Sequence, residues 1–212
     1  MEKTKIDWAD YTWNAVVGCK YNCFYCYANK QCKRWGNDFT PHWSYDQETK
    51  PYKIKEPSKI FVCSFGELFG EWISNEWIEK VLQIVKDNPR HTFQFLTKNP
   101  KRYLEFEFPG NCWLGTTIDY PNQERINWLK KKSNYKFISF EPLLGDMSGL
   151  DLSGIDFAIV GAMTGPGAII PENKWIKSIK HPNMFHKENI VKYLPSGWNK
   201  SQPAKNILNI NK

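Results

Sequence analysis

Three cysteines lie within eight residues near the start of the chain. Cys19, Cys23 and Cys26 are spaced C-x3-C-x2-C inside the segment 18–27. Thiolates are soft ligands that select zinc or iron–sulfur centres, and a loop this short can wrap its sulfurs around one centre. The opening residues MEKTKIDWAD lack the apolar stretch of a secretion signal, so we expect neither an oxidising compartment nor disulfides. The sequence therefore predicts a metal-binding loop.

The number of thiols in this loop determines which kind of centre it could hold. An electron-transfer cluster usually takes four thiolates, so three would leave one iron open to an exogenous ligand, as a catalytic zinc keeps a free position. The alternative is a zinc site completed by Cys32 or His42. Zinc loops usually contain two C-x2-C pairs, whereas only Cys23 and Cys26 have that spacing here. We favour the cluster with an open iron, and we expect Cys32 to be a helix residue.

Composition indicates one domain with a sizeable core. The chain has 212 residues, of which 41% are hydrophobic and 24% are charged, within the range of single domains. No apolar run approaches the roughly 18 residues of a membrane span, so we expect a cytoplasmic protein that does not contact a membrane. The net charge is +7, and most of it comes from eight Lys against two Glu in residues 171–212. Such a basic segment suits a polyanion such as nucleic acid, or it is a solvated tail.

Short apolar runs alternate with stretches of helical periodicity. The helical spacing is clearest in residues 74–86, where Ser74 or Asn75 is the expected N-cap, and in residues 122–132. Strand–helix alternation of this kind predicts a parallel sheet covered by helices. The runs of strand length, rich in Val, Ile, Phe and Leu, are Ala15–Val17, Ile60–Ser64, Thr92–Leu96, Cys112–Thr117, Lys136–Phe140 and Phe157–Val160.

The number of these repeats limits the architecture. Six strand-length runs over about 160 residues are too few for a closed eight-stranded barrel, which typically needs about 250 residues. We therefore predict an α/β fold, namely an open, partial TIM-like barrel of about six βα units. The barrel is expected in residues 1–170, followed by a basic C-terminal extension, residues 171–212, that packs on the barrel or extends from it.

Polar, acidic and glycine residues follow the apolar runs. The carboxyl ends of parallel strands lie at one edge of the sheet, and the chemistry of such folds gathers there. We therefore expect these residues to surround one site together with the cysteine loop. They are Phe65–Glu67, Thr97 and Lys98, Thr117–Asp119, Glu141, and Gly161–Thr164.

The cysteine loop resembles that of the radical S-adenosylmethionine superfamily, in which an aromatic residue, here Tyr25, stands just before the last cysteine. The resemblance implies that Cys19, Cys23 and Cys26 bind a 4Fe–4S cluster whose fourth iron is chelated by S-adenosylmethionine. It also implies a partial barrel of six βα units, reductive cleavage of S-adenosylmethionine to a 5′-deoxyadenosyl radical, and a one-electron donor of the flavodoxin or ferredoxin type.

Other positions look like the cofactor motifs of the same superfamily. Ser64, Gly66 and Glu67 resemble its glycine–glutamate motif, which receives the methionine amino group, although only one of the usual two glycines is present. Thr117 and Asp119 match the positions that contact the ribose in the superfamily. Gly161 and Met163 match its sixth-strand loop, which lies against adenine and methionine. For Asp119 the alternative is an N-cap or turn residue ahead of Pro121.

A narrower resemblance covers about 165 residues. A short, phage-associated radical S-adenosylmethionine family without a settled function is resembled by segments 6–8, 12–14, 93–98, 139–145, 154–156 and 164–167. This sequence departs from that family by having Met163 where an acidic residue is usual and Asn99 where a basic residue is usual. These departures concern the substrate more than the cofactor.

The reacting substrate is expected to meet Lys98 and Glu141, the two candidate catalytic residues. Lys98 would hold an anionic group or transfer a proton, or it is a solvated lysine at the edge of the site. Glu141 would contact cofactor or substrate. Hydrogen abstraction from a nucleic acid or nucleotide, for modification or repair, is the favoured reaction class. The alternatives are a small-molecule or peptide substrate, or a non-catalytic nucleic-acid-binding protein that carries zinc or an iron–sulfur cluster.

Overall fold

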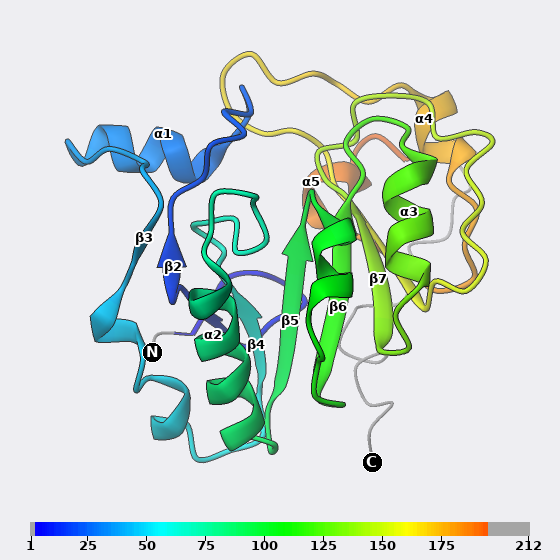
Figure 1. Ribbon diagram of the computed structural model, residues 1–212. Coiled ribbons are helices and arrows are strands. Elements are labelled where there is room, and N and C mark those ends of the chain that lie inside the picture. Colours follow the sequence, from blue (N-terminus) through cyan, green and yellow to red (C-terminus); the bar gives the residue numbers. More distant parts are fainter. Residues whose placement is uncertain (1–2, 195–212) are drawn as a thin grey trace.

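Seven parallel strands form one sheet, in the order β1-β4-β5-β6-β7-β8-β9, in the computed structural model, which describes residues 3–194 (Figure 1). The sheet curls into a half-barrel, so the predicted α/β partial barrel is confirmed. The strands are β1 (Tyr11–Trp13), β4 (Lys59–Val62), β5 (Thr92–Thr97), β6 (Cys112–Thr117), β7 (Tyr135–Phe140), β8 (Phe157–Val160) and β9 (Met184–His186).

The first and last strands of the sheet differ from the prediction. The run Ala15–Val17 was wrong as the first sheet strand, because β2 (Val16–Val17) leaves the sheet and pairs antiparallel with β3 (His42–Trp43). Its place is taken by β1, where the fully buried Trp13 lies. At the other edge β9 adds a seventh strand from within residues 171–212, and residues 195–212 of that segment lie outside the described part.

Helices α2 and α3 cover one face of the sheet (Figure 1). Helix α2 (Asn75–Asp87) is capped by Ser74, whose side chain accepts from the Trp77 N–H, as its sequence predicts. Helix α3 (Gln123–Lys130) is capped in the same way by Asn122. Helix α1 follows the cysteine loop, and two short helices flank β9: α1 (Tyr27–Arg34), α4 (Asn173–Ser178) and α5 (Glu188–Val191).

The sheet carries apolar side chains on both faces, because alternate residues of a strand point to opposite sides. One layer packs against α2 and α3, through residues such as Ile78, Val81 and Val85. The second layer is an aromatic cluster, defined here as the inner cluster, formed by Trp8, Phe61, Trp113, Phe137, Phe157, Ile159 and Phe185. The two layers hold the strands in register and leave the loops at their carboxyl ends to form the site.

Short 3-10 turns complete the described part, at Tyr45–Gln47, Pro51–Lys53 and Pro100–Glu105. Among residues 3–194, no helix is both long enough and apolar enough to span a membrane.

Candidate active site

The cysteine loop is attached to the turn after β4 by backbone hydrogen bonds. The Gly18 N–H donates to the Phe65 carbonyl over 2.9 Å, and the Glu67 N–H donates to the Gly18 carbonyl over 3.1 Å. A Cβ atom on Gly66 would lie 2.6 Å from the Val16 carbonyl oxygen, so only glycine allows this close approach. These contacts place Cys19, and the loop that follows it, at the carboxyl edge of the sheet.

The three thiols of this loop are half-buried and close enough to interact. The Cys19 and Cys26 sulfurs each accept a backbone N–H, from Tyr21 and from Asn29, both over 3.4 Å. Burial raises the pKa of the Cys19 thiol to about 12; the Tyr21 N–H opposes this rise, and the nearby Glu67, Cys23 and Cys26 add to it. Cys23 and Cys26 therefore lie within electrostatic reach of Cys19.

The donor chemistry of the loop fits a thiolate-held cluster, because three soft ligands come from one short segment. Among residues 3–194, no three His, Cys, Asp or Glu side chains are already arranged to hold a metal ion. The fit therefore rests on the ligand type of the three thiols and on their closeness to one another. Cys32 is buried in α1, the helix position that its sequence predicts, and burial raises its pKa. His42 lies on β3, where its Nδ1 is 2.9 Å from the Thr40 carbonyl oxygen.

Glu67 is a buried carboxylate held by the neighbouring strand. Its Oε1 accepts the Thr97 hydroxyl over 2.6 Å and the Phe69 N–H over 3.1 Å, while Oε2 accepts the Lys98 N–H over 3.0 Å. Burial raises the pKa of Glu67, although these hydrogen bonds oppose the rise. The carboxylate is thus fixed in orientation beside the cysteine loop. Ser64 is held in turn by the Asn14 side-chain oxygen, to which its hydroxyl donates over 3.1 Å.

Asp119 connects the cysteine loop to β5 and α3. Its Oδ2 accepts the Tyr25 hydroxyl over 2.5 Å and the Lys98 ammonium over 2.8 Å, and its Oδ1 lies 3.4 Å from the Arg125 guanidinium. Burial would raise the pKa of Asp119, but Lys98 and the Tyr25 hydroxyl outweigh it and lower the pKa below its usual value. Asp119 is not the N-cap of α3, because Asn122 fills that position.

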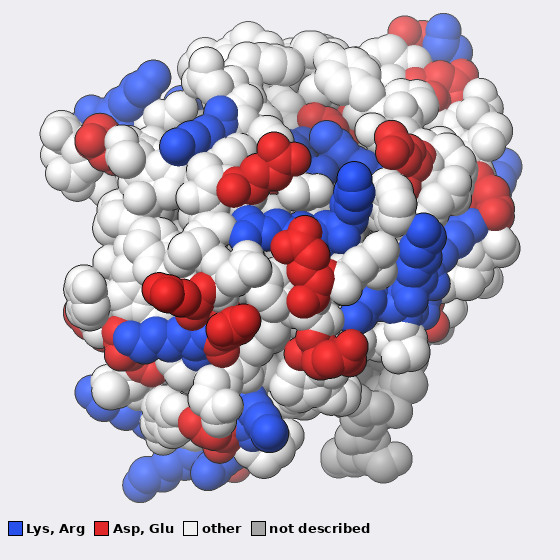
Figure 2. Space-filling model, viewed as in Figure 1, with Lys and Arg blue, Asp and Glu red and all other residues white. Residues whose placement is uncertain are grey.

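Lys98 is an enclosed side chain rather than a solvated lysine at the edge. Its side chain is 13% exposed, and its Nζ lies 5.5 Å from the centre of the Tyr25 ring, in addition to the ion pair with Asp119. Figure 2 shows Lys and Arg set among Asp and Glu over the middle and upper part of this face, which fits such paired charges. Lys98 therefore helps to position the cysteine loop.

The remaining predicted residues lie on the β6, β7 and β8 side of the same edge. Glu141 forms an ion pair with Lys187, and a Cβ atom on Gly161 would lie 3.1 Å from the Glu141 side chain. Thr117 and Met163 are each 8% exposed. The structure therefore brings the predicted residues to one edge, in two groups, around Asp119 and around Glu141.

Two residues of this network, Lys187 and Arg125, were missed by sequence reasoning. Lys187 directly follows β9, so recognition of that strand would have flagged it as a residue at the carboxyl edge. Thr97, which its place after an apolar run predicts at this edge, ends β5 and holds Glu67. Arg125, in the first turn of α3, carries no local signal of its role. Asn14, between β1 and β2, stands just before the cysteine loop in the sequence.

Solved structures of one enzyme, spore photoproduct lyase, have a fold similar to this one. Spore photoproduct lyase complexed with dinucleoside spore photoproduct is 14% identical, with a TM-score of 0.55, over 76% of this chain and 57% of that one. A mutant of that lyase with bound AdoMet and dinucleoside spore photoproduct is 13% identical, with a TM-score of 0.55, over 76% and 58%. At these identities the likeness concerns the fold.

Sequence comparison adds a curated relative and a family. "Uncharacterized protein MJ0683" of Methanocaldococcus jannaschii is 28% identical in an alignment of 179 residues that covers 68% of this chain and 64% of that protein. The chain thus spans less than two thirds of the length of the relatives it matches. The model of the family described as "Protein of unknown function (DUF5131)" matches residues 3–204. The chain therefore belongs to the DUF5131 family.

Proposed function

We propose that this protein is a radical S-adenosylmethionine enzyme in which Cys19, Cys23 and Cys26 bind a 4Fe–4S cluster. The observation that carries the proposal is the three-thiol loop bonded to the Gly66–Glu67 turn at the carboxyl edge of a parallel half-barrel. The similar fold of a lyase that binds AdoMet supports it. When bound, the cluster and S-adenosylmethionine would supply one-electron reductive cleavage and hydrogen abstraction from a substrate carbon.

The two groups of polar residues have separate tasks in this proposal. Glu67 would accept the amino group of S-adenosylmethionine, since a fixed carboxylate suits an ammonium. The Asp119 group, through Tyr25 and Lys98, would hold the cysteine loop against the sheet, with Thr117 and Asp119 beside the ribose. Gly161 and Met163 would border the adenine.

Glu141, paired with Lys187, would meet the substrate on the opposite side of the edge. The proposed substrate class is a nucleic acid or nucleotide, to be modified or repaired. The basic residues of 171–212 support it, as does the dinucleoside bound by the lyase of similar fold. A flavodoxin or ferredoxin type of donor would provide the electron. We also propose that the protein belongs to the phage-associated branch of the superfamily and that it is located in the cytoplasm.

The test is anaerobic iron–sulfur reconstitution, followed by incubation with S-adenosylmethionine and dithionite and a chromatographic assay for 5′-deoxyadenosine. The wild type is expected to form 5′-deoxyadenosine, whereas Cys23→Ala loses both the cluster and the product. Cys32→Ala is the matched control, because its thiol is buried in α1, and it is expected to keep the cluster.

Two results would contradict the proposal. Full iron content in Cys23→Ala would overturn the ligand assignment, and loss of the cluster in Cys32→Ala would indicate a four-thiolate centre instead. A wild type that takes up zinc and does not bind S-adenosylmethionine would support the non-catalytic nucleic-acid-binding protein. If 5′-deoxyadenosine forms but no oligonucleotide or nucleotide changes its rate or its amount, a small molecule or peptide becomes the substrate class.

A further inference from the structure

A pocket of about 730 Å³ lies beside the C-terminal end of α1, and neither Glu67 nor Asp119 lines it. This volume falls within the range of pockets that hold small organic ligands. Its wall combines aromatic, amide, hydroxyl and acidic side chains from the segment between β1 and β2, from the segment after α1, and from the residues that follow β3 and β4. The residues used below are Asn14, Trp35, Asn37, Asp38, Ser44 and Phe65.

The pocket contains a fixed, exposed indole. The Trp35 ring is parallel to the Phe65 ring within 5°, with the ring centres 6.2 Å apart, yet Trp35 is 58% exposed. Phe65 is held in turn, because its N–H donates to the Asn14 side-chain oxygen over 3.0 Å. One face of the indole is therefore oriented by Phe65, and much of the ring stays open to a planar partner. An aromatic platform that is already oriented loses little entropy when a ring stacks on it.

The rest of the wall suits the edge of a heterocycle. Asp38 uses Oδ1 to accept the Thr40 N–H over 3.0 Å, which leaves Oδ2 as an acceptor for a base N–H. Asn37 and Ser44 add further hydrogen-bonding groups to the wall. A purely apolar ligand would gain nothing from these groups, whereas a nucleobase uses both its face and its polar edge.

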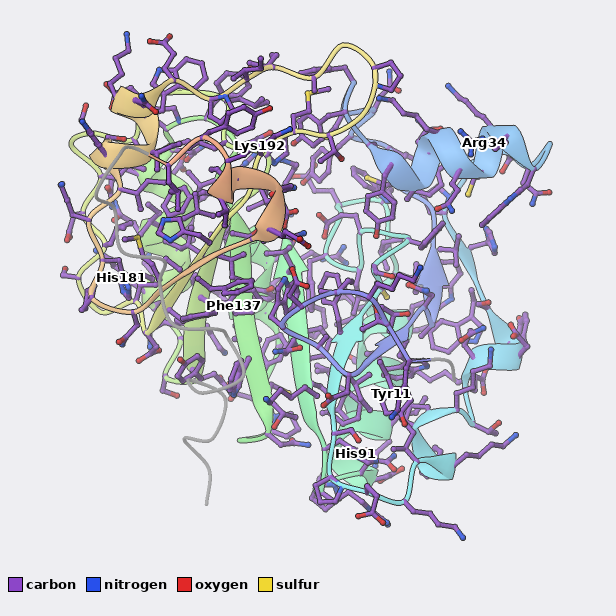
Figure 3. All side chains as sticks on the ribbon, turned by 180° about the vertical axis from the view of Figure 1, so that it is seen from behind. Tyr11, Arg34, His91, Phe137, His181 and Lys192 are labelled. Carbon is purple, nitrogen blue, oxygen red and sulfur yellow. The ribbon has the colours of Figure 1, made fainter. Side chains whose placement is uncertain are left out.

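Basic side chains lie on α1, close in sequence to the pocket residues Cys32 and Trp35. Lys30, Lys33 and Arg34 are exposed, and within residues 3–194 none of the three forms an ion pair. Figure 3 shows Arg34 at the end of α1, extending away from the sheet, and Figure 2 shows basic side chains at this corner. Cations beside a stacking platform are the combination that binds a strand through its phosphates and its bases.

We infer that this pocket binds one unpaired base of a single-stranded nucleic acid, with Trp35 as the stacking platform, Asp38 at the base edge and Lys33 and Arg34 on the phosphates. Phe65 lines the pocket and its carbonyl accepts from the Gly18 N–H at the start of the cysteine loop, so the strand would be anchored next to the reacting site. The inference rests on the proposed function in only one point, which is that the bound strand contains the nucleotide on which the enzyme acts.

The test measures fluorescence anisotropy of a fluorescein-labelled, twelve-residue oligothymidylate with the reconstituted protein at a fixed salt concentration. Trp35→Ala is expected to weaken binding about tenfold, and Trp35→Phe to restore most of it, because stacking on an aromatic ring is tolerant of its identity. Arg34→Gln is expected to weaken binding and to reduce its salt dependence, because one phosphate contact is lost.

Two controls separate the pocket from general surface binding. Tyr45 is 79% exposed and near the pocket without forming part of its wall, so Tyr45→Ala is expected to bind as the wild type does. A twelve-residue strand of abasic sugar phosphates is expected to bind more weakly than the oligothymidylate and to be insensitive to Trp35→Ala. Circular dichroism of each variant verifies that it is folded.

The inference is overturned by any one of three results. The first is an equal loss of oligothymidylate binding in Trp35→Ala and Tyr45→Ala. The second is binding of the abasic strand as tight as that of the oligothymidylate, and the third is no binding of either strand by the wild type. The same titration with Cys23→Ala distinguishes this inference from the proposed function. Trp35-dependent strand binding together with no 5′-deoxyadenosine from the wild type would support the pocket and contradict the radical chemistry. Formation of 5′-deoxyadenosine without Trp35-dependent strand binding would contradict the pocket alone.

Discussion

At the scale of single residues, the polar side chains of the carboxyl edge are already occupied by one another. Asp119 accepts from Tyr25 and Lys98 and also pairs with Arg125, and Glu67 accepts from three groups on β5 and its own turn. A buried acceptor that loses its partner costs about 1–3 kcal/mol, so these residues stabilise the loops as well as shaping the site. Changes at this edge are therefore expected to affect folding and binding together.

Glu67→Gln tests this double role. In the glutamine, an NH₂ group that cannot accept a hydrogen bond replaces one of the two carboxylate oxygens. Depending on the orientation of the amide, this NH₂ faces either the Lys98 N–H or the Thr97 hydroxyl and the Phe69 N–H. We expect the free energy of unfolding, measured by urea titration, to fall by about 1–3 kcal/mol. Binding of S-adenosylmethionine, measured by equilibrium dialysis on the reconstituted protein, is expected to weaken at least tenfold, because the negative charge is lost.

Glu71→Gln is the matched control for this substitution. Glu71 is exposed and lies four residues further along the same turn, so its substitution is expected to change stability by less than about 0.5 kcal/mol. Glu67→Gln with wild-type stability and wild-type binding would show that the carboxylate carries neither role.

At the scale of elements, the site depends on how closely two loops approach. Gly18 and Gly66 pair as a parallel bridge, and this contact fastens the cysteine loop to the turn after β4. Gly18 has a φ of +99°, a conformation that other residues rarely adopt. The relative position of the thiols and Glu67 therefore depends on these two glycines as well as on the side-chain contacts of Tyr25 and Lys98 with Asp119.

Gly66→Ala is expected to separate these loops. Its Cβ would lie 2.6 Å from the Val16 carbonyl oxygen, so the backbone must shift, at a cost of about 1–3 kcal/mol in the free energy of unfolding. We expect the iron content after reconstitution to fall severalfold while circular dichroism still shows a folded protein.

Gly110→Ala serves as the comparison, because a Cβ there meets no atom within 4 Å and the residue does not need a positive φ. It is expected to bind iron as the wild type does and to be as stable or slightly more so. If Gly66→Ala reconstitutes fully, the two loops are not coupled in the way described here.

At the scale of the whole molecule, segments from both ends of the described chain close the interior of the half-barrel. Trp8 packs on Phe61 and Phe137, with ring centres 4.6 Å and 5.7 Å apart, and Phe185 joins the same inner cluster from β9. Figure 3 shows the N-terminal segment crossing the face on which Phe137 lies. An open sheet is thus supported on both faces, which keeps its carboxyl edge free for the site.

Trp8→Ala is expected to lower the free energy of unfolding by about 3–5 kcal/mol, because a 4% exposed indole leaves a cavity in the inner cluster. Urea titration measures the change. Trp35→Ala provides the contrast, since that indole is 58% exposed, and it is expected to cost less than about 1 kcal/mol. Equal losses in the two variants would mean that the inner cluster does not support the sheet.

Local pattern accounts for much of what the sequence predicts. The run Cys112–Thr117 is β6 over its whole length, Ser74 caps α2, and Cys32 lies in a helix, because strand length, capping and periodicity depend on residues next to one another. The spacing of Cys19, Cys23 and Cys26 likewise marks the loop without reference to any other part of the chain. A parallel α/β fold then follows from the alternation of these elements.

The cysteine loop, the central strands and the class of fold follow from the sequence, whereas the edge strands of the sheet and the pairing of its polar side chains follow only from the folded structure. Val16 and Val17 are as apolar as a sheet strand, yet they pair with β3, because pairing depends on which backbone comes alongside. The ion pair of Lys187 with Glu141 joins residues 46 positions apart, through strands β7 to β9. Such contacts carry no local signal, since only the register of the folded sheet brings these side chains to one edge.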